Sequence, residues 1–162
     1  MPAVLIPIAD ALVVELNGRF RSAFTATRSY ADWALPLGAP TDLRCDVVPL
    51  NSPGVELETK SSLEYQVAAD IVLRKKFPAA ELEDVPGVTN AKRVKIASVD
   101  GLLAIVEQVI EWLATRRLTV LEEAAWQPPQ LLSAVQYSHL ASNHQFTAIL
   151  RQPYLISKTF TP

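Results

Sequence analysis

The 162-residue chain has 15 basic and 17 acidic side chains, a formal net charge of −2 and 49% hydrophobic residues. This composition is enough for one buried core, so we expect a single domain over residues 1–162. No run of Lys or Arg creates the positive field that non-specific nucleic-acid binding requires. No apolar run approaches the ~20 residues that span a bilayer, and the single cysteine excludes an intrachain disulfide, so we expect a cytoplasmic origin and no membrane partner.

The first predicted element is a short helix that begins at Pro7 and ends at Gly18. Apolar residues recur inside it at helical spacing, namely Ile8, Leu12 and Leu16. Residues 1–14 lack the basic start of a signal peptide and are interpreted as part of this helical region.

Three segments then have the composition or alternation of strands, at residues 24–30, 43–49 and 62–74. Prolines and a glycine predict a loop after the first of them, and Pro49 is expected to stop pairing at the end of the second. The third is the clearest and should be a central antiparallel strand. Residues 51–54 are expected to form a turn, whereas residues 55–61 fit either a hairpin arm or a mobile loop.

The polar connection at residues 76–97 is a candidate interaction loop, because long connections in compact domains are often functional. A solvated linker explains the same composition. The candidate contact residues in and beside this loop are the charged side chains Lys75, Lys76, Glu81, Glu83, Asp84, Lys92 and Arg93. We expect that shortening residues 78–90 leaves the fold intact but impairs assembly.

Residues 98–117 form the strongest predicted helix, with one apolar face that would cover a sheet. The apolar positions are Val99, Leu102, Leu103, Val106, Val109, Ile110 and Leu113. Ile105 and Trp112 widen this face, and Trp112 is therefore a further candidate for contact with another subunit.

Downstream of this helix, residues 131–140 fit either a short helix or a strand. Residues 145–149 and 154–158 are predicted to be extended, with Pro153 marking an edge or a bulge between them. The expected fold class is therefore α+β, with a mostly antiparallel sheet of about four to five strands and two main helices packed on it.

No motif in the sequence predicts catalysis, a metal site or a cofactor. The glycines lack the spacing of a phosphate-binding loop, and His139 and His144 stand too poorly together for a zinc site. Cys45 is interpreted as a small buried hydrophobe. Asp70 is expected to face outward and to pair with Arg or Lys of a neighbouring strand.

The order of elements nevertheless resembles the tail terminator-like proteins of long-tailed bacteriophages. The resemblance lies in an N-terminal helix, a long strand that ends in basic residues, the helix at 99–113 and three strand segments. These segments are Phe24-Thr25-Ala26-Thr27-Arg28-Ser29-Tyr30, Leu43-Arg44-Cys45-Asp46-Val47-Val48-Pro49 and Gln145-Phe146-Thr147-Ala148-Ile149-Leu150. The resemblance covers most of the chain but is least specific at residues 128–144.

This resemblance implies an α+β virion subunit that assembles as a homo-oligomer, typically a hexameric ring, on the end of the tail tube. Its implied partners are the tail tube protein and the head-side connector protein. DNA would pass through the ring without sequence-specific binding, and no enzymatic activity is implied.

Two other functions are consistent with the sequence. One is a different head-tail connector or tail-tube protein of the same virion, which closed rings or open-ended tubes would distinguish. The other is a small enzyme or ligand-binding domain that uses Cys45, Asp70 or a histidine. A pocket that brings two of these side chains together would support the enzyme.

Overall fold

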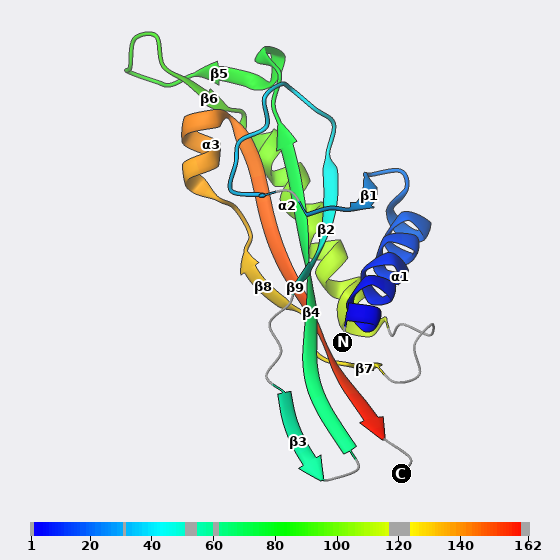
Figure 1. Cartoon of the computed structure of the whole chain (residues 1–162). Coiled ribbons are helices and arrows are strands. Elements are labelled where there is room, and N and C mark those ends of the chain that lie inside the picture. The colour runs from blue at the N-terminus through cyan, green and yellow to red at the C-terminus, as the bar shows by residue number, and fades with distance from the viewer. Residues whose placement is uncertain (1, 31, 51–54, 60–61, 117–123, 160–162) are drawn as a thin grey trace.

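The structure is a computed structural model, and it describes residues 2–30, 32–50, 55–59, 62–116 and 124–159. It confirms the α+β fold class (Figure 1). The helices are α1 (Pro2–Phe20), α2 (Ile96–Thr115) and α3 (Tyr137–Asn143), with a 3₁₀ turn, η1 (Ala79–Glu81). The strands are β1 (Thr25–Arg28), β2 (Arg44–Leu50), β3 (Val55–Thr59), β4 (Ser62–Lys76), β5 (Leu82–Asp84), β6 (Lys92–Val94), β7 (Ala124–Trp126), β8 (Gln130–Ser133) and β9 (Gln145–Thr159).

The sheet is built on the antiparallel pair β4 and β9, which run together from Ser62 opposite Thr159 to Lys76 opposite Gln145. On the outer side of β4 lie β2 and β3, and on the outer side of β9 lie β7 and β8. Only β1 is parallel to its neighbour, β2, so the described sheet is mostly antiparallel as predicted. Its seven strands exceed the expected four to five, because β7 and β8 are too short to show a period.

Several predicted elements are found close to their expected places. The central strand at 62–74 is β4, and β3 pairs with it as the hairpin arm that was one of two alternatives for 55–61. Residues 131–140, which fitted a helix or a strand, contain parts of both β8 and α3. The expected turn at 51–54 lies outside the described residues.

Pro49 was expected to stop regular pairing and Pro153 to mark an edge or a bulge, and neither does. Pro49 lies inside β2 and Pro153 inside β9. The Pro153 carbonyl accepts from Gln127 N at 3.2 Å, so the Pro153 nitrogen also faces away from β4. Val47, two residues before Pro49, likewise turns its carbonyl to the β1 side, where it accepts from Ser29 N at 3.0 Å. The missing N–H of each proline therefore removes no hydrogen bond from the pairing with β4.

The first helix is longer than predicted. It begins at Pro2 and ends at Phe20, so Pro7 and Gly18 lie inside it, and Gly18 does not have the positive φ of a left-handed cap. Pro7 is the sixth residue of α1, so its missing N–H leaves one carbonyl of the first turn without its intrahelical partner. Burial of Leu16 and Phe20 beyond the proline stabilises the remaining turns.

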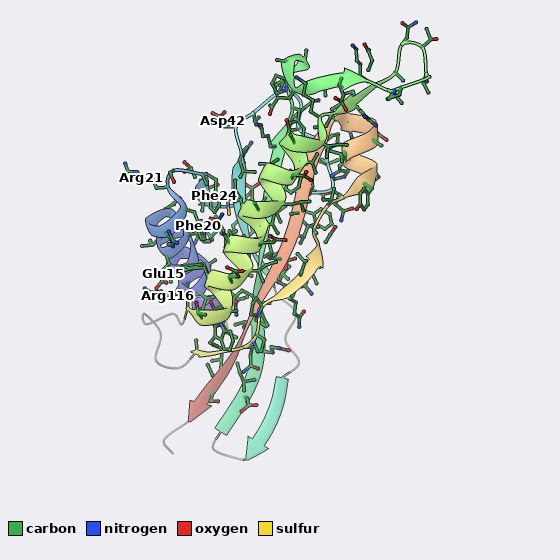
Figure 2. The ribbon with its side chains drawn as sticks, turned by 180° about the vertical axis from the view of Figure 1, so that it is seen from behind. Glu15, Phe20, Arg21, Phe24, Asp42 and Arg116 are labelled. Carbon is green, nitrogen blue, oxygen red and sulfur yellow. The ribbon has the colours of Figure 1, made fainter. Side chains whose placement is uncertain are left out.

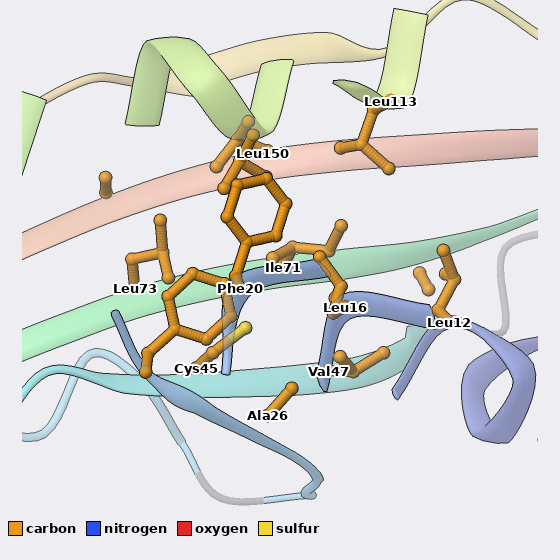
Figure 3. Packing of buried hydrophobic residues seen from close by; sticks show 14 of the residues in the cluster. Leu12, Leu16, Phe20, Ala26, Cys45, Val47, Ile71, Leu73, Leu113 and Leu150 are labelled. Atoms are coloured by element: carbon orange, nitrogen blue, oxygen red, sulfur yellow. The ribbon is translucent and has the colours of Figure 1, made fainter. Parts of the chain in front are cut away.

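The main core lies between one face of the sheet and the two long helices (Figure 3). The helix predicted at 98–117 is α2, whose fully buried positions are Leu102, Val106, Val109 and Leu113. The other predicted apolar positions of α2 are partly buried against the same core. Labelled in Figure 3 are Leu12, Leu16 and Phe20 of α1 with Ala26, Cys45, Val47, Ile71, Leu73, Leu113 and Leu150. Among the described helices, none is long and apolar enough to span a membrane.

The opposite face of the sheet holds ion pairs. The Asp46 carboxylate accepts from Arg74 Nε at 3.2 Å, and both side chains are almost completely buried. Arg151 donates to both oxygens of Asp70, at 2.8 and 3.1 Å. The predicted pairing of Asp70 with an arginine of the neighbouring strand is confirmed, but its expected outward exposure is wrong because Asp70 is buried. This hydrogen bonding raises the pKa of the Arg151 guanidinium.

We expect Arg74→Met to lower the free energy of unfolding by about 3 kcal/mol, because the buried Asp46 carboxylate then keeps only the half-exposed Arg44, whose Nη2 lies 3.8 Å away. Arg28→Met is the matched control, since the Arg28–Asp10 pair is partly exposed and should contribute no more than about 1 kcal/mol. Urea unfolding followed by circular dichroism measures both. Adding Asp46→Leu to Arg74→Met should recover most of the loss, and equal losses in the two single variants would contradict this account.

Candidate functional site

The predicted interaction loop folds as a hairpin of β5 and β6 rather than as an irregular connection. Leu82 and Val94 pair at its base and pack toward the core. The turn is possible because Gly87 and Asn90 adopt positive φ angles of 77° and 61°, which glycine and asparagine tolerate best. The hairpin projects from one end of the domain (Figure 1).

The charged side chains of the hairpin pair with one another. Glu83 and Arg93 stand directly opposite across the two strands, and their side chains are 2.8 Å apart. Asp84 and Lys92 are also opposite, at 2.6 Å. Since exposed ion pairs each contribute less than about 1 kcal/mol, they favour the strand register more than overall stability.

The base of the hairpin is attached to the sheet and to the end of α3. Lys75 Nζ at the end of β4 lies 3.2 Å from the Glu81 carboxylate. Lys95 N donates to the Glu81 carbonyl, and His144 Nε2 lies 3.3 Å from the Lys92 carbonyl. These contacts fix the direction in which the hairpin leaves the domain.

The predicted contact residues are therefore mainly structural. Six of them form the three intramolecular ion pairs of the hairpin and its base, and Lys76 donates to the Leu37 carbonyl at 2.8 Å. The tip, residues 85–90, carries no charge, and Val88 is 53% exposed there. The uncharged tip is therefore a further candidate contact surface beside the charged stem. An uncharged tip is the part that a partner could bury at least cost.

Trp112, the remaining candidate, lies far from the hairpin and packs inside the molecule. Its ring meets Phe20 edge-on with the centroids 5.7 Å apart. Beside it, Arg116 donates to Glu15 at 2.7 Å and joins the end of α2 to α1 (Figure 2). A shallow hollow of about 310 Å³ there is lined by Glu15, Gly18, Arg19, Trp112 and Arg116. Trp112 therefore stabilises the contact between helices, and only its outer edge is left for another subunit.

A second hollow, of about 300 Å³, lies beside the base of the hairpin. Its lining residues are Pro40, Thr41, Asp42, Lys75, Pro78 and Glu81, and Asp42 is labelled in Figure 2. Lys75 and Glu81 are already paired, so the hollow offers no free acid-base pair.

The side chains considered for catalysis are not brought together. Cys45 faces the core beneath α1, whereas Asp70 lies on the opposite face of the sheet. Burial, and then the nearby Asp46 charge, raise the pKa of the Cys45 thiol far above its usual range. Among the described residues, no group of three or more His, Cys, Asp or Glu side chains could hold a metal ion.

One polar network was not predicted from the sequence. Gln145 Nε2 donates to the buried Thr147 hydroxyl, which lies 3.0 Å from His139 Nδ1 on α3. The side-chain amide oxygen of Gln145, Oε1, accepts from Leu37 N at 2.7 Å. This chain joins β9 to α3 and to the loop before β2, and its polar residues gave no periodic signal that could have revealed it.

We expect Cys45 to resist thiol reagents in the folded protein, because the thiol is buried and protonated. Reaction with an aromatic disulfide reagent at pH 8 should be at least about a hundredfold slower than in urea-unfolded protein. The exposed variant Val14→Cys provides a matched reactive control. Rapid labelling of native Cys45 would contradict the structural role and support a reactive site.

Two comparisons of this sequence with known proteins identify no relative. A scan against models of protein families finds no match, and a search of curated proteins finds no similar sequence. The proposal below therefore depends on the chain's own residues and on the resemblance of its elements.

Proposed function

We propose that the chain is a structural virion protein of a long-tailed bacteriophage that caps the tail tube. In this role it ends tube polymerisation and provides the interface to the head-side connector protein. The segments that carry the resemblance to tail terminator-like proteins correspond to β1, β2, α2 and the first part of β9. These elements supply one margin of the sheet, part of its central pair and one of the two long helices that cover it, which supports the proposal.

The observation that carries the proposal best is the β5–β6 hairpin. Its stem is held by cross-strand ion pairs and its base by Lys75 and Lys95, so the uncharged tip is presented in a fixed direction. Such a projection adds little to the core. Its form suits contact with a neighbouring protein, whereas the described titratable side chains form no reactive pair.

The proposed assembly is a homo-oligomer, a hexameric ring in the tail of the virion, through which DNA passes. The tail tube protein would meet one end of the ring and the connector protein the other. A net charge of −2 suits a passage that must not retain DNA.

The direct test is the mass of the purified protein in solution, with negative-stain images after addition of tail tubes. We expect closed rings at tube ends and no further tube growth. Open-ended tubes formed by the protein itself would favour a tail-tube protein, because only a non-closing contact propagates. A strictly monomeric protein that forms no ring on added tubes would contradict the proposal.

Shortening the hairpin tests the site within this function. Replacing residues 85–91 by Asn-Gly joins Asp84 to Lys92 through a tight turn that preserves their register. We expect the thermal midpoint to change by no more than about 4 °C, since the core is untouched, and tube capping to fall at least about tenfold.

Two point variants refine this test. Val88→Ser removes only the apolar side chain at the tip and should weaken capping, whereas Leu35→Ser removes a similarly exposed side chain elsewhere and should not. Normal capping by the shortened protein would show that the hairpin is not a contact site.

A further inference from the structure

The surface formed by β8 and α3 carries no formal charge. The 27 residues between Glu123 and Arg151 include no Asp, Glu, Lys or Arg, although charged residues make up 20% of the chain. Large apolar side chains are nevertheless exposed here. Leu132 is 47% exposed and Tyr137 is 77% exposed, and Leu131 is similarly half-exposed. Depletion of charge with exposed aromatic and aliphatic groups is typical of the centre of a protein–protein interface.

The two margins of the sheet differ in how their edges are protected. The Asn17 side chain accepts from Ala26 N at 2.7 Å and donates to the Ala26 carbonyl at 2.9 Å, which closes the edge of β1. Among the residues that the structure describes, β8 pairs with β9 alone, and no side-chain hydrogen bond to its outer edge is found. An uncharged apolar edge without protection is a template for association.

A second apolar surface lies on the outer face of α1. Ile6 and Val14 are exposed on it, Val14 by 70%. Between them, at the same four-residue spacing, Asp10 accepts two hydrogen bonds from Arg28 at 2.8 and 2.9 Å, so its charge is neutralised within the chain. Tyr30 extends this surface, with its ring centroid 6.0 Å from the Arg28 guanidinium carbon.

The outer face of α2 shows what a solvent-facing helix of this chain looks like. It exposes Asp100, Glu107 and Glu111, as expected for an amphipathic helix. The outer face of α1 instead exposes Ile6 and Val14 on either side of one carboxylate, Asp10, which is paired with Arg28, although both helices cover the same face of the sheet. A helix with apolar residues on its outer as well as its inner side is normally buried on both sides, so the exposed outer side of α1 lacks the partner that would cover it.

We propose that the β8–α3 surface (Leu132 and Tyr137) of one copy docks on the outer α1 face (Ile6, Val14 and Tyr30) of a second copy. Neither surface carries a charged side chain that lacks an ion-pair partner within the chain. The two surfaces can therefore bury each other without desolvating an unpaired charge. They lie on opposite sides of the domain in Figures 1 and 2, so the contact is head-to-tail and every copy can use both surfaces. The inference takes from the proposed function only that copies of the chain associate.

Charge substitutions test this pairing directly. Val14→Glu blocks the outer α1 face and Leu132→Glu blocks the β8–α3 surface, and both positions are exposed enough to accept glutamate without unfolding the domain. Each variant alone should self-associate at least about tenfold more weakly than the wild type, because it would bury an unpaired carboxylate. A mixture of the two should form dimers and nothing larger, since one intact surface remains on each partner. Gln108→Glu on the outer face of α2 is the control and should assemble normally.

Disulfide trapping separates this inference from the proposed function, because the only native cysteine is buried. Val14→Cys mixed with Leu132→Cys should give oxidised dimers, whereas either variant alone should not. If trapping succeeds but the protein does not cap tail tubes, the docking contact stands and the phage function is wrong. If the protein caps tubes but the mixture is not trapped, or if the glutamate variants assemble like the wild type, the docking inference is wrong.

Discussion

The pairing of β4 with β9 is the constraint on which the rest of the structure depends. Its register places Ile71 opposite Leu150 under the helices and Asp70 opposite Arg151 on the other face. A slip of one residue would exchange the two faces, burying the ions beneath α1 and α2. The apolar core and the ion pairs therefore specify the same register independently. Pro153 fits this pairing only because its nitrogen faces away from β4.

Elements with one buried face could be predicted from the sequence, because burial imposes a period on the residues. Strand β4 and helix α2 were placed within about two residues of their ends for this reason. Strands of three or four residues, such as β7 and β8, have no room for a period. The partners of Asp46 and Asp70 lie 28 and 81 residues away, so their pairing depends on a register that only the folded chain defines.

At the candidate site, too, the sequence predicted the segment but not the pairing of its side chains. Composition identified residues 76–97 as unusual, but it could not show that Glu83 faces Arg93 and Asp84 faces Lys92. Charges that seemed available to a partner are used within the hairpin, and the uncharged tip remains free to make contacts. In this hairpin the charged side chains fix the shape, and the uncharged residues between them are the candidates for contact with a partner.

The ends of helix α1 were predicted poorly because the helix has apolar residues on both its inner and its outer side. Those outer residues also form its exposed apolar surface. Apolar residues occur on both its inner and outer sides, as Leu12 and Val14 illustrate, so no polar face marked where the helix begins and ends. Pro7 and Gly18 then looked like its boundaries, although core packing continues past both. In α2 the acidic outer face supplies that boundary signal, and its predicted ends were nearly right. A helix that will be buried on one side by its own sheet and on the other by a second copy has no reason to keep a polar face, which is the arrangement that the docking of β8–α3 on α1 requires.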